Sequence, residues 1–310
     1  MIEDSSFTKL LNNAFTRKMA GLKEIRTRIA SVKTTRQVTS AMKMVSAAKL
    51  KKAQDAILQI RPYAEKLHEI LVSLSASLEN VEDSVYTQNR LPEKVLVILV
   101  SSNRGLCGGF NANISKKAIE LVAEKYAKQK KLGTLDFMCI GKQGERYLKH
   151  RGYNVVANEN SLYDELTFEN VAKVAEGAMK AFENKDYDRI ELVYNQFKNA
   201  AVQVQASEQF LPVEMEEDTA DNTNYNFIYE PSKEQIIKDL IPRSLKIQFY
   251  KALLDSNAAE HGARMTAMHQ ATDNATTLIG DLTLQYNKAR QATITGEILE
   301  IVGGAEALNG

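Results

Sequence analysis

The chain has 310 residues, of which 44% are hydrophobic and 25% are charged, as in an ordinary globular protein with a real core. Its formal net charge of +1 argues against a general nucleic-acid-binding protein, and no run of about 18 apolar residues predicts a membrane span. Cys107 and Cys139 are too few for a disulfide scaffold and lack the spacing of metal ligands.

Residues 1–18 differ in character from the rest of the chain. Phe7, Leu10 and Phe15 fall on one helical face, which allows a targeting peptide. Glu3 and Asp4 disfavour a transit peptide, and this segment contains no secretory apolar stretch. We therefore expect a disordered N-terminal extension over 1–18, with Met19 as an alternative start.

A long helix is predicted from Met19 to about Leu78, interrupted in composition only by Gly21 and Pro62. Its apolar residues are spaced three and four apart, with an expected change of phase around 34–36: Leu22, Ile25, Ile29 and Val32, then Val38, Met42 and Val45. At about 1.5 Å per residue this helix is roughly 80–90 Å long. It must therefore pack on a partner helix, and we assign 19–92 to an N-terminal coiled-coil helix.

The segment 93–230 predicts an α/β domain, because strand and helix patterns alternate along it. The strands are expected at 95–100, 135–140, 153–157, 190–197 and 202–211, and the helices at 112–129, 144–150 and 168–183. This alternation is typical of a Rossmann-like domain with a mostly parallel sheet. An acidic loop with five carboxylates, over 213–224, is expected to be mobile.

The segment 231–310 predicts a second coiled-coil helix. Ser232 and Gln235 form a capping-box start, Pro242 predicts a kink or a fresh start, and Gly303 and Gly304 predict the end. The expected seam consists of Met268, Ala271, Ala275, Leu278, Leu282, Gln285, Ala289 and Ala292. The predicted fold class is α/β with long helical extensions, in which the two terminal helices form an antiparallel coiled coil.

The glycine-rich segment SSNRGLCGGFN (101–111) follows a strand and opens a helix, where α/β folds place phosphate loops. It matches neither GxxxxGK[ST] nor GxGxxG, so a tight turn is the favoured interpretation over a nucleotide site. Cys107 near the helix start is a redox candidate, although a buried thiol is the simpler expectation. The four histidines form no metal motif, so we expect no catalytic residue, metal or cofactor.

A basic stretch is the strongest charge signal. Between Met19 and Lys52, Glu24 is the only acidic residue, against nine bases. The bases are Lys23, Arg26, Arg28, Lys33, Arg36, Lys43, Lys49, Lys51 and Lys52. A solvated helix face, a nucleic-acid helix and a surface for an acidic protein all fit; the lack of any aromatic residue over 19–52 disfavours nucleic acid.

Three segments carry a family resemblance: 19–54, 101–111 and 263–308. Together they closely resemble the gamma subunits of F-type ATP synthases, and the resemblance runs in order from Met19 to Gly310. It implies a non-catalytic rotor shaft that couples proton-driven rotation of the membrane c ring to ATP synthesis or hydrolysis. The implied partners are the hexamer of alpha and beta subunits, the epsilon subunit and the c ring.

The resemblance also implies individual roles. Rotor–stator contacts with the beta subunit are implied for Met42, Lys43, Arg290, Gln291 and Thr295. An apolar bearing tip is implied for Ile294, Ile298, Leu299, Ile301 and Val302. A foot that meets epsilon and the c ring is implied for Tyr229 and Glu230.

The implied location is the cytoplasmic face of a bacterial inner membrane, reached only through the complex, with the matrix side of a mitochondrial inner membrane as the alternative. Two other functions remain open at this point. A static coiled-coil scaffold would share the helices, and a nucleotide-dependent enzyme would use the α/β domain.

Overall fold

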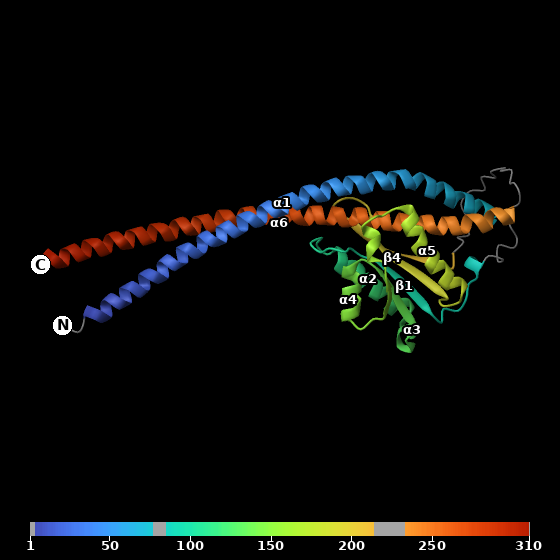
Figure 1. Ribbon diagram of the computed structural model, residues 1–310, viewed down its shortest axis with the longest axis horizontal. Helices are drawn as coiled ribbons and strands as arrows, with labels where there is room; N and C mark the ends of the chain where they lie inside the picture. Colours follow the sequence, from blue (N-terminus) through green and yellow to red (C-terminus); the bar gives the residue numbers. More distant parts are fainter. Residues whose placement is uncertain (1–3, 77–84, 214–232, 310) are drawn as a thin grey trace. The chain divides into compact units, whose positions relative to one another are not determined.

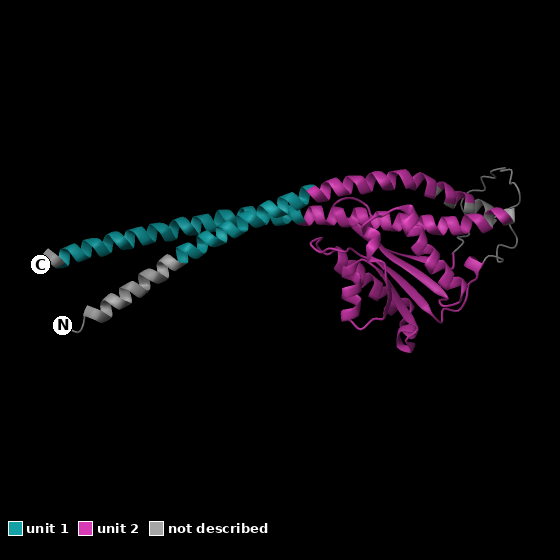
Figure 2. Ribbon diagram, in the orientation of Figure 1, with its two compact units in different colours: residues 1–44, 268–310 teal, residues 45–267 magenta. Residues whose placement is uncertain are grey.

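The computed structural model describes residues 4–76, 85–213 and 233–309 (Figure 1). Two long helices, α1 (Asp4–Ala76) and α6 (Lys233–Asn309), flank an α/β segment. The chain divides into two compact units: unit 1 comprises 1–44 and 268–310, and unit 2 comprises 45–267 (Figure 2). Each long helix contributes to both units, whereas the sequence placed the boundaries at 18, 92 and 230.

Unit 2 contains a five-stranded sheet in the order β3-β2-β1-β4-β5. The strands are β1 (Val95–Val100), β2 (Leu135–Ile140), β3 (Val155–Asn158), β4 (Arg189–Phe197) and β5 (Gln203–Leu211). Strand β1 pairs in parallel with β2 and β4, β3 is parallel to β2, and β5 is antiparallel to β4. The prediction of a mostly parallel sheet is confirmed.

Helices cover both faces of this sheet, as the continuous apolar runs of β1 and β2 require. On one face lie α2 (Phe110–Lys125) and α4 (Lys142–His150), which pack on Val97 and Leu99 of β1. On the other face lie α5 (Phe168–Glu183) and part of α6, which pack on Ile98. Successive strand residues thus point to opposite layers.

The helix predicted over 112–129 is divided in the structure. α2 ends at Lys125 and α3 (Ala127–Leu132) follows, with Tyr126 at φ −125° and ψ 28° between them. The Tyr126 ring is buried, and its hydroxyl donates a hydrogen bond to the buried carboxylate of Glu191. The break at Tyr126 thus coincides with a hydrogen bond to a buried carboxylate, a long-range contact that periodicity could not indicate.

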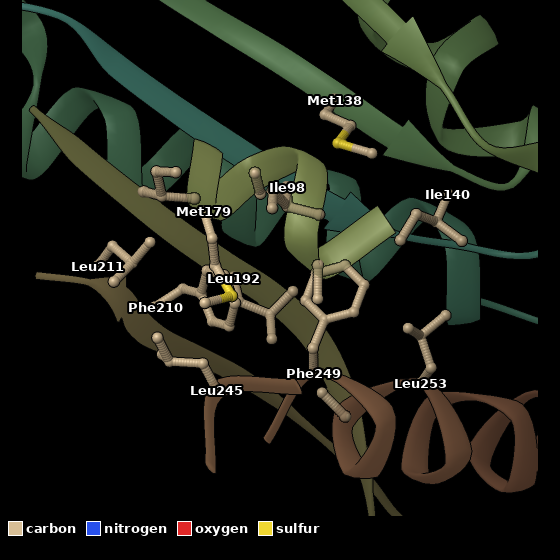
Figure 3. Close-up of a cluster of buried hydrophobic side chains, with 14 of the residues drawn as sticks. Ile98, Met138, Ile140, Met179, Leu192, Phe210, Leu211, Leu245, Phe249 and Leu253 are labelled. Carbon is tan, nitrogen blue, oxygen red and sulfur yellow. The ribbon is translucent and has the colours of Figure 1, made fainter. Parts of the chain in front are cut away.

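Helix α6 is part of the core of unit 2. Leu245, Phe249 and Leu253 reach toward the sheet, where the Phe249 ring lies 5.5 Å from that of Phe210 (Figure 3). Their spacing of four residues keeps them on one face of α6. The sequence-based division at 230 left this third layer out of the α/β domain.

The ends of the long helices also differ from expectation. α1 begins at Asp4, so residues 4–18 are helical where a disordered extension was expected. α6 continues through Pro242 and past Gly303 and Gly304 to Asn309. A Cβ at either glycine would meet no atom within 4 Å, and glycine in a helix interior costs only about 1 kcal/mol relative to Ala. The acidic loop from 214 onward lies outside the described residues.

Asp255 is an unusual charge in the core of unit 2. It is 1% exposed, and its Oδ1 has no hydrogen-bond partner among the described residues. Burial raises the pKa of this carboxyl to about 6, and the charges of Lys251 and Arg61 oppose the shift only in part. Its ionised form is therefore less stable in the folded chain than in water.

Replacing Asp255 by Asn tests the free-energy cost of burying the ionised carboxylate. Because the folded pKa lies above the unfolded value, the carboxyl's contribution to stability is present at low pH and is lost as pH rises from about 4 to about 6. Asp255→Asn should remove that loss and raise the free energy of unfolding near neutral pH by on the order of 1–3 kcal/mol. Urea unfolding at several pH values measures it, with the exposed Asp281→Asn as control. An unchanged pH slope would contradict the assignment.

Candidate partner-binding surface on the terminal helices

In unit 1 the inward face of α6 carries a continuous seam. Its buried or half-buried residues, spaced alternately four and three apart, are Met268, Thr272, Ala275, Ile279, Leu282, Tyr286, Ala289 and Thr293. The prediction is confirmed at the seam positions spaced seven residues apart that begin with Met268. It is wrong at Leu278, Gln285 and Ala292, which are exposed. From each confirmed position, the next seam residue can lie three or four residues further along, and both choices fit an apolar pattern. The position of the partner helix decides which of the two is buried.

The seam of α1 in unit 1 is more polar than predicted. It runs through Leu22, Ile25, Ile29 and Val32 and continues in the same phase through Arg36, Thr39 and Lys43. The expected change of phase is wrong, since Val38 is 52% exposed. The hydroxyls of Thr39 and Thr272 lie 2.9 Å apart, which ties the antiparallel helices together by a polar contact.

The bases of α1 are distributed around the helix. Arg36 and Lys43 are half-buried at seam positions, and Met42 beside them is also half-buried. The other seven are exposed, and within 21–66 only Lys66 forms an ion pair among the described residues. The exposed bases therefore surround this part of α1 with solvated positive charge, which is compatible with an acidic partner.

Near its C-terminal end, α6 presents polar and apolar side chains away from the seam. Arg290, Gln291 and Thr295 are exposed. The apolar group is exposed as well: Ile294 by 45%, Ile298 by 55%, Leu299 by 67%, Ile301 by 71% and Val302 by 54%. These exposed apolar side chains follow one another within nine residues of α6, which makes this end of the helix a candidate surface for a protein partner.

Helical geometry separates this surface from α1. At about 100° per residue, Gln291, Ile298 and Val302 lie on the side of α6 opposite the buried Thr293. The exposed Leu284, which the sequence analysis missed, falls on the same side. The α1 seam lies on the other side of α6, so these residues take no part in the pairing of the two helices.

The structure does not bring the predicted α1 and α6 contacts together. Thr39 lies opposite Thr272, and Arg290 lies 18 residues further along α6, about 27 Å away. Met42 and Lys43 therefore lie at one position along the axis of the helix pair, and Arg290 lies at another. Tyr229 and Glu230 lie outside the described residues.

The glycine-rich loop of unit 2 uses its polar groups within the chain. The backbone N–H of Ser102 donates to Asn111 Oδ1 at 2.9 Å, and the Ser102 hydroxyl donates to the Arg104 carbonyl at 2.6 Å. Leu106 and Gly108 have positive φ values of 62° and 59°, as in a tight turn. Burial raises the pKa of the Cys107 thiol, which disfavours the reactive thiolate.

Comparison with known proteins adds a family. Residues 21–308 match the family model described as ATP synthase. The ATP synthase gamma chains of Christiangramia forsetii and Flavobacterium johnsoniae are each 56% identical over 292 residues, which is 94% of this chain and 100% of each relative. None of the described helices combines the length and apolarity needed to span a bilayer.

Solved structures share the fold at lower identity. A rotor chain of the Euglena gracilis mitochondrial ATP synthase is 19% identical and has a TM-score of 0.64, covering 89% of this chain and 99% of the other. A central-stalk chain from Tetrahymena thermophila is 23% identical with a TM-score of 0.55, covering 76% and 99%. The architecture of long terminal helices around an α/β segment is thus a known one.

Two leucines of α6 test the corrected seam. Leu282 is 3% exposed, whereas Leu284 is 62% exposed. Leu282→Ala should lower the free energy of unfolding of unit 1 by about 2–5 kcal/mol, because it opens a cavity between the helices. Leu284→Ala should change it by less than about 0.5 kcal/mol. Hydrogen exchange of α1 and α6 amides measures both, and equal effects would refute the seam.

Proposed function

The chain belongs to the ATP synthase family, among the gamma chains, and from that premise we propose how its terminal helices act. It is the non-catalytic central shaft of the complex and couples rotation driven by proton flow to ATP synthesis or hydrolysis. The observation that carries the mechanism is the exposed face of α6, which lies opposite the seam and needs a partner. That partner is the hexamer of alpha and beta subunits.

The chemistry of this face suits a surface that turns. Ile294, Ile298 and Val302 make apolar contact, which is non-directional and lets one surface slide on another. Arg290 and Gln291 supply directional hydrogen bonds to a beta-subunit loop, with Thr295 beside them. Bonds from a charged donor contribute about 1.5–3 kcal/mol, enough to favour one orientation without fixing it.

The helix pair is asymmetric, which gives it the means to bias three otherwise equivalent sites. One side of the α6 tip is apolar, and α1 carries bases that would face the acidic loop of a beta subunit near Met42 and Lys43. Each rotational position thus presents different contacts to each beta subunit. A conformational equilibrium shifts only through such a difference in contact energy.

Unit 2 is the part proposed to meet the epsilon subunit and the c ring, with Tyr229 and Glu230 at the foot. The complex then carries the chain to the membrane. The bacterial origin of the relatives at 56% identity favours the cytoplasmic face of a bacterial inner membrane.

Reconstitution tests the shaft function directly. Expressed with alpha and beta subunits, the chain should copurify as one copy per hexamer, and a bead attached to it should rotate during ATP hydrolysis. Rotation separates a shaft from a static scaffold. Copurification with hydrolysis but a stationary bead would refute the proposal, as would failure to copurify.

A double substitution tests the polar contacts of α6. Replacing Arg290 by Ala and Gln291 by Leu in the complex should lower ATP hydrolysis about tenfold or more, since hydrogen bonds of a charged group are lost. The exposed Gln285→Leu on the same helix is the matched control and should keep the wild-type rate. Helix content by circular dichroism should stay unchanged in both. A wild-type rate in the double variant would remove these residues from the contact.

A further inference from the structure

A buried ion pair lies on α6 in unit 2. Arg264 is 8% exposed and Glu260 is 7% exposed, and their Nη1 and Oε1 atoms are 2.7 Å apart. Charged side chains are almost never this buried unless each is paired. Burial raises the pKa of Glu260, while the Arg264 charge beside it opposes the shift. The pair neutralises itself inside the chain, so it is not a surface for a charged partner.

The remaining donors of Arg264 hold the loop that follows β1. Its Nη2 donates to the carbonyl of Arg104 at 3.0 Å and to that of Gly105 at 3.3 Å, and its Nε also donates to Gly105 at 3.3 Å. A planar guanidinium can hold two carbonyls and a carboxylate at fixed angles, which a lysine cannot. Arg264 therefore fixes the direction of the loop as well as its distance.

Burial also determines the charge state of His261, the neighbour of Arg264 on α6. His261 Nδ1 lies 3.4 Å from Arg264 Nη1. Burial, followed by the charges of Arg264 and Lys49, lowers the pKa of His261 to about 4. The ring is therefore neutral near pH 7 and adds no positive charge beside the guanidinium.

Apolar contacts also join this loop to α6. Cys107 and Phe110 pack against Ala259 and Ala263, a small cluster whose alanines let the loop approach α6 closely. Leu106, at φ 62°, has a backbone conformation that leucine rarely adopts, which persists only where surrounding contacts impose it. The Arg264 hydrogen bonds to the two preceding carbonyls are such contacts.

The contacts of the sheet and its loops with α6 extend along the helix. They begin at the apolar patch around Phe249 and Leu253 (Figure 3), continue where Phe197 of β4 packs at the clusters of Ala258 and Ala259, and include the Arg264 hydrogen bonds. Arg264 lies 11 residues beyond Leu253, about 16 Å along the helix. The β4–β5 turn docks nearby, where Thr266 Oγ1 donates to the Ala200 carbonyl at 3.2 Å. The apolar contacts are non-directional, whereas the Arg264 hydrogen bonds fix an angle as well as a distance at this end of the interface.

We propose that Arg264, oriented by Glu260, is a positioning residue for rotary coupling. By clamping the 101–111 loop, it prevents the α/β part of unit 2 from twisting about α6 under load. Torque applied to the sheet then reaches the helix without being absorbed by local rotation. This inference rests on the proposed shaft function.

The test uses the complete ATP synthase in proteoliposomes. Arg264→Gln should lower the ratio of ATP-driven proton pumping to ATP hydrolysis about threefold, while hydrolysis falls less than about twofold. Arg264→Lys keeps the charge but lacks the planar guanidinium, so the ratio of proton pumping to ATP hydrolysis should fall in this variant as well. Arg146→Gln on α4 is the matched control, because Arg146 is exposed and outside the clamp.

Thermal unfolding of each complex distinguishes a loss of coupling from a loss of folding stability. Arg264→Gln leaves the buried Glu260 carboxylate without its cation, so Arg264→Lys, which keeps the charge, is the deciding variant. A lower pumping ratio in Arg264→Lys at an unchanged unfolding temperature supports the clamp. An unchanged ratio overturns the proposal, and so does a ratio that falls only together with the unfolding temperature. If the wild-type complex itself neither rotates nor pumps, that result refutes the proposed shaft function. It is thereby distinguished from a failure of the Arg264 clamp, which shows only in the variants.

Discussion

The pairing of α1 with α6 depends on side chains spaced alternately three and four apart, a repeat that turns one narrow face of each helix toward the other. In unit 2 this face brings Leu50, Ala53 and Ile57 of α1 against Leu254 and Ala258 of α6. A pair of helices can bury only that one stripe on each member. Every other face is left for a partner, which is why unit 1 can expose an apolar surface without losing its own pairing.

The seam itself is weaker than a fully apolar one. Arg36, Thr39 and Lys43 occupy seam positions of α1, where polar groups contribute less burial than leucine would. A polar contact such as Thr39 with Thr272 also favours a single register, because a slip by one heptad would leave both hydroxyls among other neighbours. For a shaft under torque, we infer that register matters more than maximal stability.

Some of this architecture follows from sequence alone. The apolar runs at 95–100 and 135–140 and the helix at 168–183 have the predicted bounds, because buried strands and an amphipathic helix carry local signals. The seam at Leu278, Gln285 and Ala292 was misplaced by one residue, since its register depends on the other helix. Arg264 and Glu260 escaped notice because their role depends on a loop about 160 residues away. Long-range contacts of this kind leave no mark in local periodicity.

The contacts within the chain and those proposed outside it differ in kind. Arg264 and Glu260 are held in a buried site, where screening by solvent is weak and geometry is fixed. The bases of α1 and the tip of α6 are exposed, where an ion pair contributes only about 0–1 kcal/mol. A rotating part needs this division, because the bonds that transmit force must outlast those that are broken at each step. Strong polar contacts therefore belong inside the shaft, and weak or non-directional ones on its surface.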